Sequence, residues 1–134
     1  MKDIGQLILP NDIRYAKDHE WARPDGNKVR IGLSDYAQGQ LGDIVFVELP
    51  QVGSTFKQGE PFGTVESVKT VAELFMPIGG TILAVNTTLE ISPELVNNNP
   101  YDKGWMIDVE PSESSELESL MTKDVYLEML KGIE

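Results

Sequence analysis

The sequence predicts an all-β domain with short accessory helices and one helix at its carboxyl end. Short apolar runs recur at close spacing along most of the chain, and glycine, proline or asparagine separates them. Helical spacing of apolar residues is sustained only near the carboxyl terminus. A chain of 134 residues can bury one modest core, so we expect a single domain over residues 1–134.

The first predicted element is a β-hairpin over about residues 21–33. Val29, Ile31 and Leu33 alternate with polar or small residues, which is the pattern of a half-buried strand. The run Pro24-Asp25-Gly26-Asn27 supplies the turn that leads into this strand.

A short helix and a buried strand are expected next. Ser34 is a suitable N-cap, and Gly42 should end the helix one or two turns later. Residues 44–49 are apolar on both faces except at Glu48, so we expect a strand covered on both sides, and Pro50 should end it.

A second hairpin places a lysine at its tip. Residues 61–65 and 71–75 both have strand character, and Glu66-Ser67-Val68-Lys69-Thr70 connects them. Most single lysines are solvated surface residues, and that is the simplest alternative for Lys69. Its place on a tight turn between two strands instead favours an attachment point that other proteins can reach.

The remaining elements are two strands and two helical segments. Strands are expected at 81–85 and 105–109, and Pro93 can open a helical turn because proline fits the first helical position. Thr122 can cap a final helix that ends before Gly132 and packs on the sheets.

Composition excludes several classes of function. The formal net charge of −11 argues against nucleic acid, because phosphates require clustered Lys and Arg. The chain has no cysteine and one histidine, so we expect neither disulfides nor a zinc site. The run Leu7–Pro10 is too short for a secretory signal, and no apolar run could span a bilayer, so we expect a cytoplasmic protein without membrane contact.

Several blocks, found in order along nearly the whole chain, resemble the H proteins of the glycine cleavage system. They are Tyr15–Trp21, Ile31–Gln38, Leu41–Pro50, Phe62–Asn86, Pro93–Asn97, Asn99–Tyr101 and Gly104–Met106. Thr70, Met76 and Gly79 depart from the residues usual in that family. The resemblance implies a lipoyl-type barrel-sandwich hybrid with short accessory helices and a C-terminal helix.

The resemblance also implies a function. Lys69 would carry a covalently attached lipoate, and the protein would be a non-catalytic shuttle that acts as a monomer. Its partners would be a glycine decarboxylase, an aminomethyltransferase that uses tetrahydrofolate, a dihydrolipoamide dehydrogenase, and a lipoate ligase or lipoyltransferase. It would pass the aminomethyl group from the first to the second and the dithiol to the third.

Three carboxylates are implied to dock the amine of this cargo, namely Glu20, Glu73 and Asp18. A carboxylate can hold a primary amine as a cation through a charge-assisted hydrogen bond. Each could instead be an ordinary surface or strand residue with a weak ion pair. His19 is expected to be packed or hydrogen-bonded beside Trp21 and to have no role as a general base.

Other functions remain open from the sequence. A lipoyl carrier or donor for another pathway, such as lipoate relay or sulfur-compound oxidation, would use similar blocks. A biotin carrier also presents a lysine on a hairpin, but that family has Met on both sides of the lysine, where this chain has Val68 and Thr70. A hydrolase is the least supported, because Ser67 lies in no nucleophile elbow and His19 is the only histidine.

Overall fold

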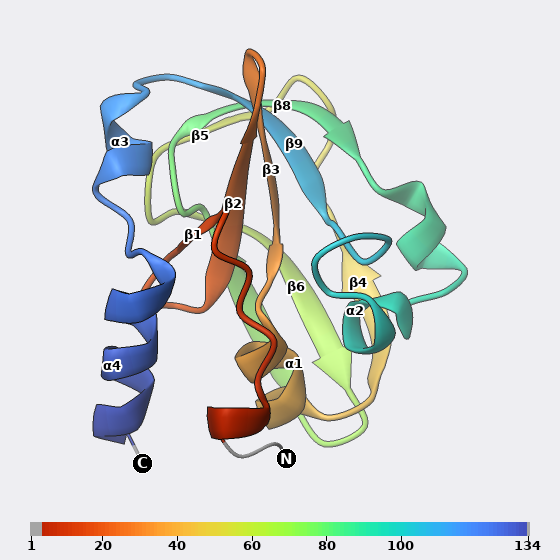
Figure 1. The fold of residues 1–134 in the computed structure, drawn as a ribbon. Helices are drawn as coiled ribbons and strands as arrows, with labels where there is room; N and C mark the ends of the chain where they lie inside the picture. The colour runs from red at the N-terminus through yellow and green to blue at the C-terminus, as the bar shows by residue number, and fades with distance from the viewer. Residues whose placement is uncertain (1–3, 134) are drawn as a thin grey trace.

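Two antiparallel β-sheets form the body of the molecule, with short helices around them (Figure 1). The structure is a computed structural model and describes residues 4–133, so residues 1–3 and 134 of the expected domain lie outside it. The larger sheet has the strand order β1 (Arg14–Tyr15), β2 (Glu20–Asp25), β3 (Lys28–Leu33), β9 (Ile107–Pro111), β8 (Gly80–Val85), β5 (Thr55–Phe56). The smaller sheet has the order β4 (Ile44–Glu48), β6 (Pro61–Ser67), β7 (Val71–Phe75).

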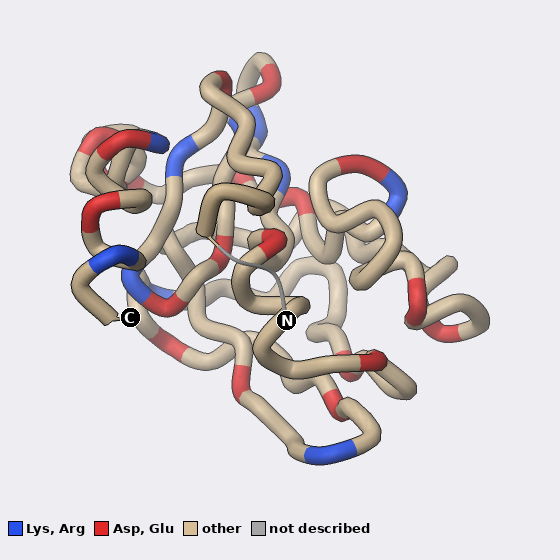
Figure 2. The backbone as a smooth tube through the Cα atoms, turned by 60° about the horizontal axis from the view of Figure 1, so that its bottom comes forward, with Lys and Arg blue, Asp and Glu red and all other residues tan. Residues whose placement is uncertain are grey.

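The helices are short except the last. They are η1 (Ile4–Gln6), α1 (Asp35–Leu41), η2 (Thr87–Glu90), α2 (Leu95–Asn98), α3 (Ser115–Glu118) and α4 (Lys123–Ile133). The predicted fold class, all-β with short helices and a C-terminal helix, is therefore confirmed. Figure 2 shows that acidic segments are spread over the chain and outnumber basic ones.

The predicted hairpins are present. β2 and β3 pair around the turn at Gly26, whose positive φ of 63° suits glycine, and Val29, Ile31 and Leu33 are buried as expected. Ser34 caps α1, because its Oγ accepts the Ala37 N–H at 3.3 Å.

One strand differs from its prediction. Residues 44–49 were expected to be covered on both faces, but Val45 and Phe46 of β4 are 48% and 52% exposed. β4 is an edge strand of a three-stranded sheet that packs on one face only, and a β-bulge lies between Ile44 and Phe46. The apolar run on β4 therefore places side chains on an open sheet face as well as in the core.

The carboxyl end also differs in detail. The last strand begins at Ile107, two residues later than expected, and α4 continues through Gly132 to Ile133. Tyr126 and Leu130 of α4 pack in a second apolar cluster with Tyr15 and Trp21. This cluster fixes α4 against the turn between β1 and β2, and that turn borders the candidate site.

Candidate functional site

Lys69 lies at the tip of the β6–β7 hairpin and is exposed. Ser67 closes this tip: its N–H donates to the Thr70 carbonyl at 2.8 Å, and its Oγ accepts the N–H groups of Lys69 and Thr70 at 3.2 and 3.1 Å. The position of Lys69 is thus set by hydrogen bonds of the backbone on both sides of it. The prediction that Lys69 lies on the turn of a hairpin is confirmed. Its modification remains a prediction.

The side chain of Lys69 extends over the end of α1. A Cβ built on Gly42 would lie 3.3 Å from Lys69 Cε, and Gly42 has a positive φ of 82°. Glycine at this position therefore satisfies the backbone conformation and leaves space for the lysine stem. Figure 1 shows the hairpin tip beside α1.

Asn97 of α2 supports this contact and was not recognised as a site residue from the sequence. Its amide donates to the carbonyl of Gly42 at 2.8 Å and accepts the N–H of Ile44 at 2.8 Å. The intervening Asp43 carbonyl accepts the N–H of Val68 at 3.0 Å. In the sequence, Asn97 was noted only as part of the block Pro93–Asn97. Its role could not be predicted because Gly42 and Ile44 are far from it along the chain.

A cleft of about 310 Å³ lies between β7 and α1. Its walls are β7 with Val65 of β6, the helix α1, and the turn that contains Asp18, His19 and Glu20. Leu33, Leu41, Val65, Ala72 and Leu74 give it an apolar lining. The cleft can therefore accept a flexible apolar chain that ends in a polar group.

The structure brings the three predicted carboxylates to this cleft. Asp18, Glu20 and Glu73 all line it, and Asp18 and Glu73 are exposed while Glu20 is only 1% exposed. Glu20 reaches across to the edge of the smaller sheet, where its Oε2 accepts the Phe75 N–H at 3.1 Å. The three carboxylates implied by the family resemblance are therefore neighbours in space, but the resemblance did not indicate that Glu20 is buried.

The second oxygen of Glu20 is unusual. Among the described residues, Glu20 Oε1 is the buried side-chain oxygen or nitrogen without a hydrogen-bond partner. Burial raises the pKa of Glu20 from its ordinary value to about 8. A buried acceptor without a donor is costly, so this oxygen is suited to a donor that arrives with a ligand.

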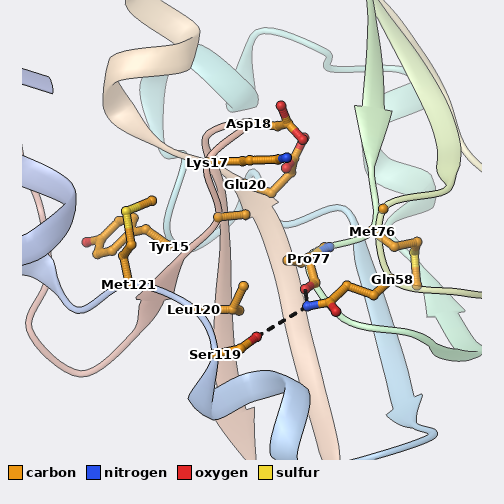
Figure 3. A pocket seen from close by; sticks show the side chains of 12 residues that line it. Tyr15, Lys17, Asp18, Glu20, Gln58, Met76, Pro77, Ser119, Leu120 and Met121 are labelled. Atoms are coloured by element: carbon orange, nitrogen blue, oxygen red, sulfur yellow. Dashed lines mark hydrogen bonds between the residues drawn. The ribbon is translucent and has the colours of Figure 1, made fainter. Parts of the chain in front are cut away.

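A second cavity of about 440 Å³ lies on the other side of the same turn (Figure 3). Asp18 and Glu20 border both cavities. In Figure 3, Lys17, Asp18 and Glu20 lie together at one side of the cavity, and Gln58 donates to Ser119 Oγ at 3.4 Å across it. The turn with the two carboxylates thus forms a wall between the cavities.

His19 is a packed ring in the wall of the cleft. Burial lowers its pKa, and its Nδ1 lies 2.8 Å from the hydroxyl of Tyr126. Its ring packs against the rings of Tyr36 and Tyr126. The prediction of a packed or hydrogen-bonded histidine is confirmed, with Tyr36 and Tyr126 as its ring neighbours where Trp21 was expected.

Residues 4–133 bear on two other kinds of site. No group of three or more His, Cys, Asp or Glu side chains in this range could hold a metal ion. Over the same residues, no helix has the length and apolar character needed to cross a membrane.

Comparisons with known proteins give one consistent result. The family model of the glycine cleavage H-protein matches residues 13–133. The glycine cleavage system H protein of Bacillus licheniformis is 59% identical over 125 residues, which are 93% of this chain and 98% of that protein. The H protein of Bacillus subtilis is 59% identical over 123 residues, or 92% of this chain and 97% of the relative. The crystal structure of the H protein from Mycobacterium marinum matches with a TM-score of 0.85 and 38% identity, over 92% of this chain and 99% of that one.

Proposed function

The chain belongs to the glycine cleavage H-protein family and is the shuttle protein of that system, and we propose that Lys69 is the residue that carries its lipoyl group. The structural match supports the lipoyl-type barrel-sandwich fold expected from the resemblance. The relatives reported above are all H proteins of the glycine cleavage system, which favours this role over lipoate relay or sulfur-compound oxidation.

The residues present fit a lipoyl arm. Lys69 is exposed on a turn that is fixed on both sides, and its stem lies beside Gly42, the residue that follows Leu41 in the wall of the apolar cleft. Strand residues rise about 3.3 Å each, so Glu73 lies within roughly 13 Å of Lys69 along the chain. When bound, lipoate would supply a disulfide that accepts the aminomethyl group and a dithiol that is reoxidised. The protein supplies the position, the apolar lining and the carboxylates.

The proposed role of the carboxylates rests mainly on Glu20. A protonated amine that reached the inner end of the cleft would favour the ionised form of Glu20, so the carboxyl would release its proton to solvent and Oε1, the buried oxygen without a partner, would accept from the ammonium group. Asp18 and Glu73 are exposed at the border and would add charge that attracts the cation. The apolar lining would limit the access of water to the amine-bearing carbon.

The surface around Lys69 suits recognition by the enzyme that modifies it. Phe46, Glu66 and Val71 lie opposite one another on neighbouring strands, so their side chains share the open face of the smaller sheet. Val71 and Val68 are 62% and 70% exposed, and Glu66 is exposed. We propose that this face contacts the lipoate ligase or lipoyltransferase.

The chain would be a single non-catalytic carrier domain over residues 1–134 that works as a monomer. It would exchange cargo with glycine decarboxylase, the aminomethyltransferase and dihydrolipoamide dehydrogenase. A cytoplasmic location is in keeping with its bacterial relatives.

The attachment site is tested by peptide mass mapping. The protein is incubated with a lipoate ligase, lipoate and ATP, and the proposal expects the added mass only on the peptide with Lys69. The variant Lys69→Arg should gain no mass. Modification at another lysine, or of the arginine variant, would refute the assignment.

The carboxylates are tested on the loaded carrier. Glu20→Gln and Glu73→Gln should accept lipoate normally but release ammonia and formaldehyde faster, because the first removes a carboxyl group that can give up its proton to pair with the amine and the second removes a carboxylate at the border of the cleft. Glu48→Gln is the matched control, since Glu48 is exposed on the same sheet as Glu73 but does not line the cleft. If both variants released ammonia and formaldehyde at the rate of Glu48→Gln, the proposed role of Glu20 and Glu73 in holding the amine would be refuted.

A further inference from the structure

His19 occupies a backbone position that usually favours glycine. The turn between β1 and β2 is closed by the Ala16 N–H to Glu20 carbonyl bond at 2.8 Å and the His19 N–H to Ala16 carbonyl bond at 2.9 Å. This leaves a three-residue loop, Lys17-Asp18-His19, whose last residue normally adopts the left-handed conformation. His19 has a φ of 77° and is the only residue other than glycine with positive φ among residues 4–133. A side chain in this conformation costs free energy and persists where the surroundings hold it.

The surroundings that hold His19 come from distant parts of the chain. Its Nδ1 lies 2.8 Å from the Tyr126 hydroxyl, and the same hydroxyl lies 2.8 Å from Ser34 Oγ. The Ser34 N–H donates to the His19 carbonyl at 2.9 Å. Tyr126 and Ser34 are fully buried, and Tyr126 belongs to α4. The turn is therefore tied to the carboxyl-terminal helix and to the start of α1.

The two residues on either side of His19 in the chain are the carboxylates at the cleft. Asp18 and Glu20 both border the two cavities, and His19 itself lines the cleft. Any rotation of the His19 backbone would change the direction of both carboxylates. Glycine would suit the backbone of this position better, so the histidine ring has a function that glycine could not supply.

We propose that His19 is a positioning residue, whose ring, held by Tyr126 and Ser34, fixes the turn so that the Asp18 and Glu20 carboxylates face the cleft. The functional part of this inference rests on the proposed role of the cleft in docking the cargo amine. The positioning itself is a property of the unmodified protein, so it can be tested apart from lipoylation.

The test variant is Tyr126→Phe, which keeps the ring and removes the hydroxyl. Tyr15→Phe is the matched control: Tyr15 is equally buried, its ring stacks on Tyr126 at 4.5 Å, and its hydroxyl donates to the Pro10 carbonyl at 2.8 Å. His19→Gly is a second variant that accepts the positive φ without strain but lacks the ring. At least one of the two test variants should therefore keep the fold, even where the other is destabilised.

The readouts are NMR signals of the unmodified protein. His19 is the only histidine, so ¹⁵N-labelled histidine gives one pair of ring signals. Tyr126→Phe should shift the Nδ1 signal, and Tyr15→Phe should leave it unchanged. The second readout is the titration of the Glu20 carboxyl carbon, whose midpoint should be near 8 in the parent protein. Other charged groups near Glu20 are Asp18 at both cavities, Lys17 at the larger cavity and Glu73 at the cleft, and Tyr126 faces the site from α4. Lys17, Asp18 and Glu73 are unchanged in every variant.

In Tyr126→Phe and in His19→Gly, the Glu20 midpoint should fall by about one pH unit or more, a tenfold change in its ionisation, because a loosened turn admits water. In Tyr15→Phe it should stay at the parent value. An unchanged Glu20 midpoint in both test variants would refute the positioning role, as would an equal fall in the control. If Lys69 proved not to be lipoylated, these results on the unmodified protein would still stand, so the two proposals fail separately.

Discussion

Replacement of Glu20 by glutamine should remove a large part of the pH dependence of stability. Glu20 is buried, and burial raises its pKa from the ordinary 4.5 to about 8, so the folded state holds a proton that the unfolded state releases. The stabilising effect of this proton is complete below about pH 4.5 and is lost as the pH rises toward 8. Glutamine keeps an oxygen that can accept the Phe75 N–H and does not titrate.

The size of the effect follows from the two pKa values. Each pH unit between them changes the free energy of unfolding by about 1.4 kcal/mol per proton. Between about pH 5.5 and pH 7.5, Glu20 alone should therefore lower the stability of the parent protein by about 2.5 kcal/mol. Glu20→Gln should lack this term, so its stability relative to the parent should rise by the same amount over that range.

The assay is urea unfolding of both proteins at the two pH values. The difference of differences isolates Glu20, because the other titrating groups are common to both proteins. Glu73→Gln serves as the control, since it makes the same substitution at an exposed carboxylate of the same cleft. If the free energy of unfolding changed by the same amount with pH in the parent and in Glu20→Gln, the claim that Glu20 is buried and protonated in the folded state would be refuted.

Two further predictions concern the attachment hairpin. Lys69→Arg should change the free energy of unfolding by no more than about 0.5 kcal/mol in urea titrations, because the side chain is exposed; a larger loss would make Lys69 structural. Asn97→Ala should lower stability by about 1 to 3 kcal/mol and slow lipoylation of Lys69, since it leaves the carbonyl of Gly42 and the N–H of Ile44 without their partner. For Asn97→Ala, thermal melting measures the loss of stability and a timed mass assay measures the rate of lipoylation. A normal rate of lipoylation in this variant would show that the hydrogen bond from Asn97 to Gly42 is not needed for the modification of Lys69.

The sequence predicted the elements whose signals are local. The β2–β3 hairpin has both an alternating pattern and a turn with glycine at the position of positive φ. The Lys69 hairpin has strand residues on both sides of a closed tip. Ser34 identified the start of α1 because an N-cap bonds to a residue three positions later.

Features that depend on distant residues could not be predicted in this way. Apolar residues on β4 indicated burial, but exposure depends on how many layers cover a strand, and the smaller sheet is covered on one face. The turn before β2 was missed because His19 stands where the turn chemistry favours glycine, and its support comes from Tyr126. The burial of Glu20 likewise requires β7 to approach β2 in space.

The central claim, that Lys69 is the point through which this chain shuttles the aminomethyl group, is tested most directly by glycine-dependent exchange of labelled carbon dioxide. The lipoylated protein is mixed with the cognate glycine decarboxylase, glycine and labelled bicarbonate, with Lys69→Arg treated in the same way as the control. The account predicts that label enters glycine with the lipoylated parent and not with the variant. Complete lipoylation of Lys69 without exchange, or exchange that persists in the arginine variant, would contradict it.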